Sequence, residues 1–199
     1  MLQRTILFFL LLCCTSLAAQ MPMQASAPDQ SWEKQQRWEE RNDLDGRFRL
    51  LAPGQLNHSI DTIETAIGAQ AYHTFHLRVP DKDRAENILY VLSYVDYPAG
   101  SLHHDSTELV QEFLVNTQEE AAEAVGGEVI YGTEKLVGAA YPGRLWRIDY
   151  NGGRASARTL ACVASTRYYE LKVFSLSAAG LGTAADRFFD SLRLWVPSS

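Results

Sequence analysis

The chain has 199 residues, of which 46% are hydrophobic and 21% charged, with a formal net charge of -6. This is the composition of a globular protein, and the length suffices for a hydrophobic core without disulfides or bound metal. The acidic balance and the absence of Lys/Arg runs argue against nucleic acid or an anionic membrane surface as a partner.

Residues 1–19 have the pattern of a secretory signal peptide. Arg4 supplies the positive charge, Ile6–Leu12 is an unbroken apolar run, and Ser16–Ala19 offers small residues for cleavage. The apolar run is too short for a permanent membrane helix. We therefore predict cleavage after Ala18 or Ala19, export to the periplasm or the extracellular space, and no integral membrane segment in the mature chain.

The cysteines leave one alternative open, a lipoprotein anchored through Cys14 or Cys13. A lipobox has a small residue before the cysteine, whereas here Leu12 and Cys13 hold that position. If both cysteines leave with the signal peptide, Cys162 remains, so no intramolecular disulfide is expected. Loss of Arg4 with the same segment changes the net charge from -6 to -7.

The rest of the chain divides into a leader and one domain. Residues 20–45 are mostly polar and predict a flexible leader. Within it, Ser31–Asn42 is compatible with a short helix whose large apolar residues are Trp32 and Trp38, and the sequence does not decide whether that helix docks on the domain. Residues 46–196 are predicted to form a single domain.

Four strand-like segments open this domain: Arg47–Leu51, Leu56–Thr65, Ala69–Val79 and Ile88–Tyr97. Leu56–Thr65 is mostly polar, as expected of an edge strand. Ile88–Tyr97 is apolar on both faces, whereas a strand with one wet face alternates. We therefore predict that Ile88–Tyr97 is central and covered on both sides.

A long helix follows over Asp105–Val125, where Asp105 and Glu108 form a capping-box pattern and Gly126-Gly127 supplies the stop. Four more strands are predicted after it: Glu128–Val137, Gly143–Tyr150, Ala155–Ser165 and Arg167–Leu176. Asn151-Gly152-Gly153 between two of them is a strong hairpin signal.

The last strand and the second helix have clear core faces. In Arg167–Leu176, Tyr169, Leu171 and Val173 should face the core, while Glu170 and Lys172 face out. A helix over Thr183–Leu194, capped by Thr183, presents an apolar stripe of Leu181, Ala184, Ala185, Phe188, Phe189 and Leu192. The order of elements predicts an α+β domain, with an antiparallel β-sheet of about seven or eight strands covered by two main helices.

Several segments resemble a group of exported bacterial proteins of unknown function: GRFRLLAPG at Gly46–Gly54, YVDYP at Tyr94–Pro98, YPGR at Tyr141–Arg144, RYYEL at Arg167–Leu171 and RFFDSLRL at Arg187–Leu194. Those proteins are similar in plan to the PsbP-like α/β/α sandwich. The resemblance covers Gly46–Leu194 and implies an antiparallel sheet between helices. It implies no catalytic residues, and because members of that fold mostly bind partners, it favours a binding role by analogy.

His103, His104 and Asp105 form the cluster most suggestive of chemistry. Imidazoles beside a carboxylate can bind a transition metal or exchange protons, and the cluster precedes a predicted helix N-terminus. Against this, neighbouring side chains tend to point apart, Asp105 is predicted as the N-cap, and no third ligand is visible at suitable spacing. We therefore assign no catalytic residue and no metal ligand from the sequence.

Other candidates are weaker. His73 and His76 fall on opposite faces of a predicted strand, and Cys162 lies inside one, where a free cysteine behaves as a small hydrophobe. Six aromatic residues could line a groove for a small ligand or peptide, or else form cross-strand pairs and core: Tyr94, Tyr97, Tyr141, Trp146, Tyr150 and Tyr168. The candidate binding residues are His103, His104, Tyr97, Trp146 and Tyr150.

Two hypotheses of function follow. The preferred one is a soluble exported binding or accessory domain without catalysis and without a cofactor, whose partner is an unknown protein or small molecule of the cell envelope. The alternative is a small hydrolase or metal-dependent enzyme that uses His103, His104 and Asp105. The two differ in whether those three side chains converge to within metal-ligand distance.

Overall fold

The computed structural model describes residues 31–65, 68–138, 140–176 and 181–195. The predicted signal peptide, the leader up to residue 30 and the predicted domain end at 196 lie outside these ranges. In chain order the elements are α1 (Trp32–Gln35), β1 (Glu39–Asp43), β2 (Phe48–Ala52), β3 (Asn57–Thr65), β4 (Gly68–Arg78), β5 (Leu89–Asp96), α2 (Thr107–Ala124), β6 (Glu128–Val137), β7 (Tyr141–Tyr150), β8 (Ala155–Ala164), β9 (Arg167–Ser175), α3 (Thr183–Asp190) and β10 (Arg193–Leu194).

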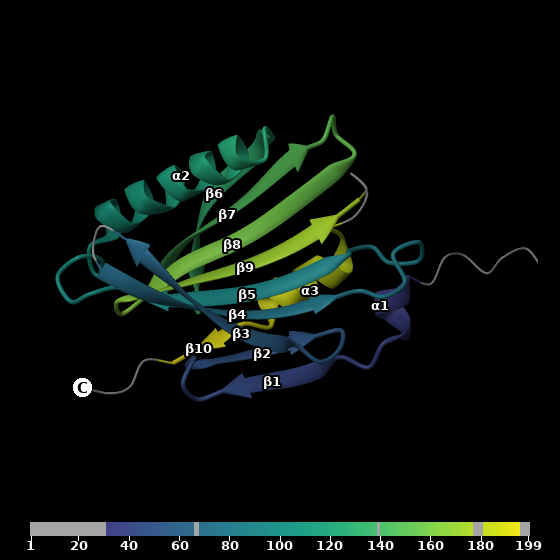
Figure 1. The fold of residues 1–199 in the computed structure, drawn as a ribbon, viewed down its shortest axis with the longest axis horizontal. Helices are drawn as coiled ribbons and strands as arrows, with labels where there is room; N and C mark the ends of the chain where they lie inside the picture. The colour runs from purple at the N-terminus through teal and green to yellow at the C-terminus, as the bar shows by residue number, and fades with distance from the viewer. Residues whose placement is uncertain (1–30, 66–67, 139, 177–180, 196–199) are drawn as a thin grey trace, which may run out of the picture.

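The strands form two antiparallel sheets. The main sheet has seven strands in the order β3-β4-β5-β9-β8-β7-β6, and a three-stranded sheet has the order β1-β2-β10 (Figure 1). The α+β prediction, with two main helices and about seven strands in the large sheet, is confirmed. The small sheet was not predicted, and it takes in the segment around Arg47–Leu51 that the sequence assigned to the main one.

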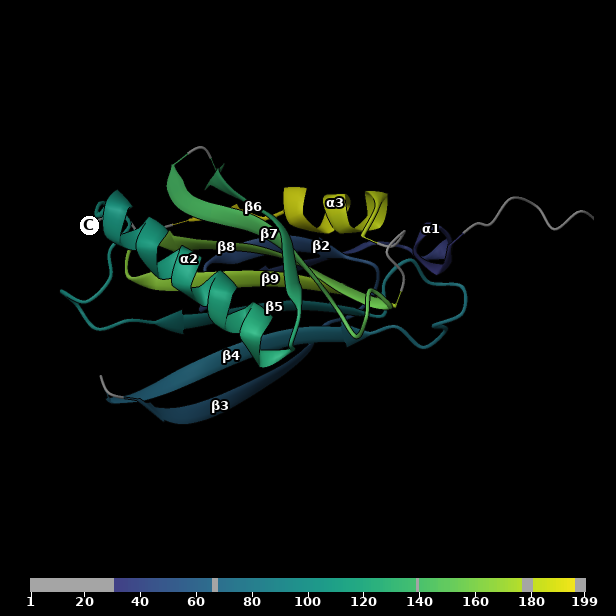
Figure 2. The same cartoon turned by 90° about the horizontal axis from the view of Figure 1, so that it is seen from above.

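The two faces of the main sheet are covered by different elements. Helix α2 packs over β6, β7 and β8 on one face, while α3 and the small sheet lie on the other (Figure 2). The core is therefore divided in two. One cluster includes Phe48, Tyr90 and Phe188 on the α3 side, and the other includes Val110 and Trp146 under α2.

The predicted central segment Ile88–Tyr97 forms β5, an interior strand whose Tyr90 and Leu92 are fully buried. The middle position of the sheet belongs to β9, which pairs with β5 on one side and β8 on the other. Val91, on the α2 face of β5, is half-buried because α2 lies over β6 to β8 and leaves that part of the face less covered.

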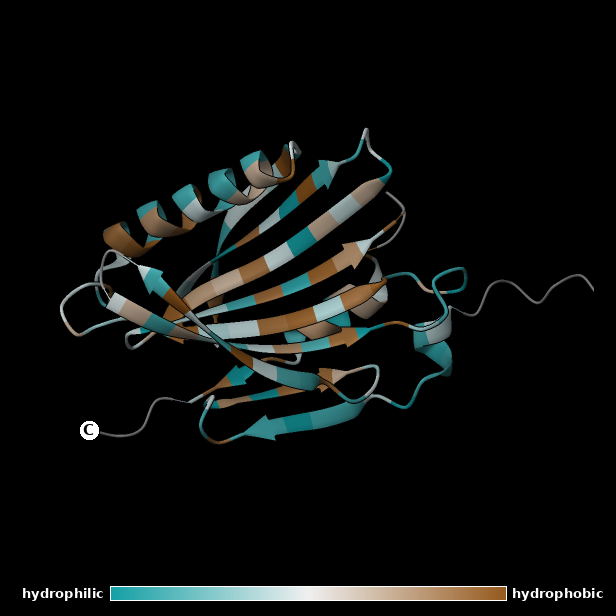
Figure 3. Ribbon diagram, in the orientation of Figure 1, coloured by the Kyte–Doolittle hydropathy of each residue, from teal (hydrophilic) through white to brown (hydrophobic). Residues whose placement is uncertain are grey.

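The helix predicted over Ser31–Asn42 is wrong beyond Gln35. The helix ends there, and Glu39–Asp43 pairs with β2 as strand β1. This strand is hydrophilic along its length (Figure 3), so its sequence lacks the apolar alternation that marks a strand, and only its pairing with β2 makes it one. The segment does dock on the domain, since Glu33 is buried and Trp38 packs edge-on against Tyr90 with ring centroids 6.4 Å apart.

Both predicted helix starts need correction. Helix α2 begins at Thr107 with Ser106 as N-cap, because the Asp105 carboxylate faces the two neighbouring imidazoles instead of the helix N–H groups. Helix α3 begins with Thr183 as its first residue after Gly182. It ends at Asp190 rather than Leu194, because Arg193–Leu194 pairs with β2.

The predicted apolar stripe of the C-terminal segment is confirmed, since all six of its residues are buried: Leu181, Ala184, Ala185, Phe188, Phe189 and Leu192. Tyr169, Leu171 and Val173 are also buried, as predicted. Glu170 was expected to face solvent but is only 8% exposed. The reason is that β9 is the middle strand, so residues of β5 and β8 lie on both sides of Glu170, with Ser93 and Ala161 directly opposite it.

Candidate functional site

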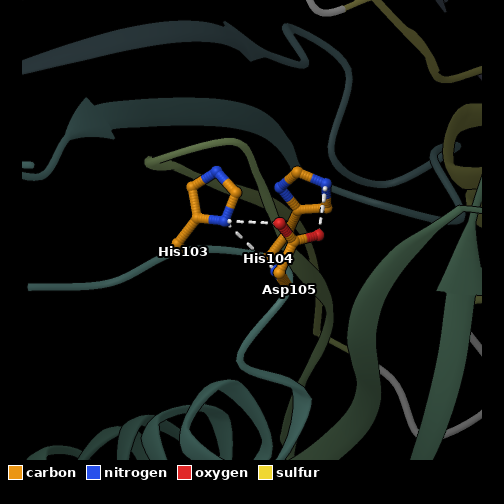
Figure 4. A group of neighbouring side chains, drawn as sticks. All are labelled: His103, His104 and Asp105. Carbon is orange, nitrogen blue, oxygen red and sulfur yellow. Dashed lines mark hydrogen bonds and ion pairs between the residues drawn. The ribbon is translucent and has the colours of Figure 1, made fainter. Parts of the chain in front are cut away.

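His103, His104 and Asp105 converge in the loop between β5 and α2 (Figure 4). His103 Nδ1 lies 3.3 Å from Asp105 Oδ2, and His104 Nε2 lies 3.3 Å from Asp105 Oδ1. One nitrogen from each imidazole and a carboxylate oxygen all lie within 4.8 Å of one another. The expectation that these neighbouring side chains point apart is therefore wrong, because Asp105 is not a helix cap and its carboxylate lies between the two rings.

The cluster is held in place by the turn between β8 and β9. The His104 backbone N–H donates to the Ser165 carbonyl at 3.0 Å, and the Ser165 N–H donates to His104 Nδ1 at 3.1 Å. Ser165, at this turn, has a φ of 57°, in the left-handed region of backbone conformation. Close by, the Tyr97 N–H donates to the Thr166 carbonyl at 2.9 Å. The loop that precedes α2 is thus attached to this hairpin by three hydrogen bonds.

These bonds determine which nitrogen of His104 carries the proton. An acceptor needs a lone pair, so the bond from Ser165 places the ring proton of neutral His104 on Nε2, the nitrogen that lies 3.3 Å from Asp105 Oδ1. A metal at Nε2 would need the lone pair there and would move the proton to Nδ1, directly opposite the Ser165 N–H. Metal binding in this geometry therefore costs the Ser165 hydrogen bond.

The cluster is partly exposed to solvent. The side chains of His103, His104 and Asp105 are 40%, 27% and 78% exposed. His104 also meets Tyr141 edge-on, with ring centroids 5.7 Å apart. At this exposure the contacts with Asp105 are screened by water and contribute little to stability. The cluster is accessible enough to receive a ligand, but its Asp105 is not held in a buried, preorganised position.

The aromatic candidates do not share one groove. Trp146 is fully buried in the core under α2. Tyr97 is half-buried on the same face and lies edge-on to Phe113, with ring centroids 5.6 Å apart. Burial raises the pKa of Tyr97 to about 12. Tyr94 belongs to the core on the opposite face. Tyr150 is half-buried at the margin of α2. The structure therefore separates residues that the sequence analysis grouped.

Tyr150 lines an apolar groove of about 190 Å³ between the C-terminal half of α2 and the main sheet. Side chains from α2 and from β7, β8 and β9 form its walls: Ala121, Ala124, Val125, Ile148, Tyr150, Ala157, Thr159, Lys172 and Phe174. Thr159 and Lys172 supply polar groups, and the Lys172 ammonium lies 2.9 Å from the Glu170 carboxylate. Except for Tyr150, sequence reasoning missed this groove. The signal was the run of small alanines late in the helix, which leaves space against the sheet.

A second cavity, of about 320 Å³, lies where α1 meets α3. Glu33, Trp38, Glu86 and Thr183 contribute to its lining, and the Arg187 guanidinium sits 4.4 Å from the Trp38 ring centroid. The Glu33 carboxylate turns inward and accepts hydrogen bonds from the loop before β5. This cavity therefore lies between the N-terminal segment and the rest of the domain.

A stack of aromatic rings connects β3, β4 and β5 on the α3 face. His58 stacks on Phe75 at 4.1 Å, and His73 stacks on Tyr94 at 4.4 Å, with His58 Nε2 and His73 Nδ1 3.3 Å apart. Burial, and then the electrostatic interaction with the neighbouring His58 imidazole, lower the pKa of His73. His76 points to the other face, as predicted, so His73 and His76 do not form a metal pair.

The comparisons agree with this fold. No protein-family model matches the sequence, and no curated protein matches it. Among solved structures, the chain is similar to the solution structure of the cyanobacterial PsbP (CyanoP) from Synechocystis sp. PCC 6803. The TM-score is 0.53 over 79% of this chain and 92% of that chain, with 9% sequence identity.

This likeness shows an α+β domain with a PsbP-like fold, which confirms the resemblance drawn from the sequence. At 9% identity it shows the fold alone. Within the described ranges, no helix has both the length and the hydrophobicity needed to span a bilayer.

Proposed function

We propose that this chain is an exported, non-catalytic binding or accessory domain, and that it binds a small, mainly apolar molecule in the groove between α2 and the main sheet. The observation that carries the proposal is the groove itself. It is apolar along most of its lining, has Thr159 and Lys172 as polar groups, and includes Tyr150, which the sequence analysis named as a binding candidate.

The size of the groove limits its ligand. Ligand pockets are mostly apolar with a few polar groups that orient the ligand, and those for drug-sized molecules measure about 300–1,000 Å³. A volume of about 190 Å³ suits a smaller molecule or one apolar side chain of a partner. The Lys172 ammonium, already paired with Glu170, can also interact with a polar end of the ligand.

A fluorescent apolar probe tests the groove directly. N-phenyl-1-naphthylamine should bind the wild type with single-site saturation. Ala124→Trp, at the exposed margin of the groove, should weaken binding at least tenfold. Asn116→Trp, exposed on the same helix but away from the groove, is the matched control and should bind as the wild type does. Non-saturating binding, or equal binding by all three proteins, would contradict the proposal.

Export is the second part of the proposal and rests on the signal-peptide pattern at residues 1–19. It places the partner or ligand in the periplasm or outside the cell. Mass analysis of the protein purified from its native host should find a mature N-terminus near Gln20 without lipid. An acylated Cys14 as the first residue would instead establish the lipoprotein alternative.

One observation favours the alternative of a metal-dependent enzyme, namely the convergence of His103, His104 and Asp105. Calorimetric titration with Zn²⁺ and the absorption spectrum with Co²⁺ test it. The Ser165 bond to His104 Nδ1 leads us to expect weak binding, with Kd above about 100 μM. Stoichiometric submicromolar binding that is lost in both His103→Ala and His104→Ala would favour the enzyme.

A further inference from the structure

The β3–β4 hairpin extends beyond the rest of the main sheet (Figure 2). β3 pairs with β4 over the whole of Asn57–Thr65, but β4 pairs with β5 only between His73 and Arg78 in the part of the chain that the structure describes. The outer half of the hairpin, Asp61–Thr65 with Gly68–Tyr72, is therefore a two-stranded ribbon. Such a ribbon is only marginally stable by itself in water, and pairing with a third strand increases its stability.

The outer edge of β3 is open. β3 is the terminal strand of the main sheet, and residues 57–64 are all exposed. Two of them are large and apolar, since Ile60 is 56% exposed and Ile63 50%. An exposed edge of this length presents a row of backbone donors and acceptors to any strand of suitable sequence.

β6, at the other edge of the same sheet, is protected in the ways that natural proteins use. Its register shifts at a bulge between Val129 and Tyr131, and it carries Lys135. Bulges and edge lysines both hinder pairing with another chain. β3 has neither, because its register with β4 is continuous over nine pairs and its sequence, NHSIDTIET, contains no Lys, Arg or Pro.

We propose that β3 pairs antiparallel with β3 of a second copy of this chain, with Ile60 opposite Ile60 of that copy, so that the two main sheets become continuous. A two-fold axis perpendicular to the sheet keeps each side chain on its own face, so pairs form between residues on the same face. An interface of this kind is isologous, with the same surface on both copies.

The charges of the facing side chains and the number of residues that can pair favour this register over the alternatives. A register centred on Asp61 places two like carboxylates opposite each other, which is unfavourable, and one centred on Thr62 places Ile60 opposite Glu64. A register centred on Ile63 reaches the end of β3 at Thr65 after two residues on each side, and one centred on Ser59 reaches the start of β3 at Asn57 after two. The register centred on Ile60 has none of these defects.

In the Ile60 register the facing residues are complementary. Ser59 faces Asp61 of the second copy, so a hydroxyl can donate to a carboxylate, and His58 faces Thr62. The isoleucines cover each other. Both copies are acidic, since the whole sequence has a formal net charge of -6, so association should strengthen as salt screens their repulsion. The proposal is independent of the groove under α2, to which β3 contributes no residue.

Sedimentation equilibrium of the full chain tests the association. Wild type should show a concentration-dependent monomer–dimer equilibrium, and Ile60→Lys should weaken it at least tenfold. Ile130→Lys is the matched control, because Ile130 is 47% exposed on the protected edge β6, and it should associate as the wild type does. Thermal melting would confirm that both variants fold. A wild type that stays monomeric up to about 1 mM, or equal association by both variants, would overturn the proposal.

Cross-linking tests the register in a background with Cys13 and Cys14 replaced by Ser, where the remaining native Cys162 is buried. Directly opposite residues have Cβ atoms about 4.5–5.5 Å apart, which small adjustments bring to disulfide distance. Ile60→Cys should therefore form a dimeric disulfide at least tenfold faster than Ile63→Cys, a position of similar exposure that faces Asn57. Equal rates at the two positions would refute the register.

Discussion

Replacing Glu33 with alanine should destabilise the domain, because its buried carboxylate attaches the N-terminal segment to the main sheet. Glu33 is 2% exposed. Its Oε1 accepts hydrogen bonds from the Asn87 N–H at 2.8 Å and the Tyr90 hydroxyl at 3.1 Å, and its Oε2 accepts one from the Glu86 N–H at 3.0 Å. Burial, followed by the charge of Glu33, raises the pKa of Tyr90, so this phenol remains a donor.

The magnitude follows from the donors that lose their acceptor. A buried donor left unpaired costs roughly 1–3 kcal/mol, and removing the carboxylate returns part of its own desolvation cost. With three donors affected and some relaxation of the loop at Glu86, the net loss is about 3 kcal/mol, a large share of a typical stability of roughly 5–15 kcal/mol. For a domain of this size that loss lowers Tm by about 6–12 °C.

Scanning calorimetry of the two proteins measures this loss, and Lys34→Ala is the matched control. Lys34 is the next residue along the same helix but is exposed, so its replacement should change Tm by less than about 2 °C. Limited proteolysis adds a second readout, since a detached segment should be cut first. If Glu33→Ala and Lys34→Ala melted together, the docking of the N-terminal segment would not contribute to the stability of the domain.

Three other predictions concern the rest of the fold. Phe188→Ala, at a fully buried position, should lower the free energy of unfolding measured by chemical denaturation by about 3–5 kcal/mol. Arg187→Ala should lower it by about 1 kcal/mol or less, and equal losses would show that α3 is not packed against the sheet through Phe188. The Arg167 guanidinium, bonded at 2.6 and 2.7 Å, lowers the pKa of Asp96 below 3.8. The ion pair therefore stabilises the fold above pH 3.8, and this stabilisation is lost as the pH falls through the lowered pKa of Asp96. Between about pH 5 and pH 2.5, the free energy of unfolding should therefore fall less for Asp96→Asn than for the wild type. Burial raises the pKa of Cys162 to about 12, so this thiol should not react with Ellman's reagent at pH about 8 until the protein unfolds, and rapid native labelling would contradict its burial.

Local patterns in the sequence determined most of the elements. The apolar stripe around Phe188 and Phe189 has helical spacing and is buried, and the polar segment Leu56–Thr65 is an edge strand. Asn151-Gly152-Gly153 forms the predicted turn, with φ values of 53°, 65° and 77°. Such features are visible in a sequence because they depend on residues a few positions apart or on the conformational range of a single residue.

The segments that resemble a group of exported bacterial proteins, similar in plan to the PsbP-like sandwich, predicted the fold as a whole, since they correspond to turns and core positions spread along the domain. They did not predict the second sheet. Glu39–Asp43 is polar and becomes strand β1 only by pairing with β2, and Arg193–Leu194 joins the same sheet from the far end of the chain. Neither segment carries a periodic pattern that local reasoning could use.

The candidate sites were decided by tertiary structure for the same reason. Asp105 has the spacing of a helix cap, yet its carboxylate lies between His103 and His104, and the position of His104 depends on Ser165 in a distant hairpin. The groove at Tyr150 exists because α2 crosses three strands while small side chains leave space beneath it. The energies of these contacts come from groups far apart along the chain, and no local periodicity records which of them meet.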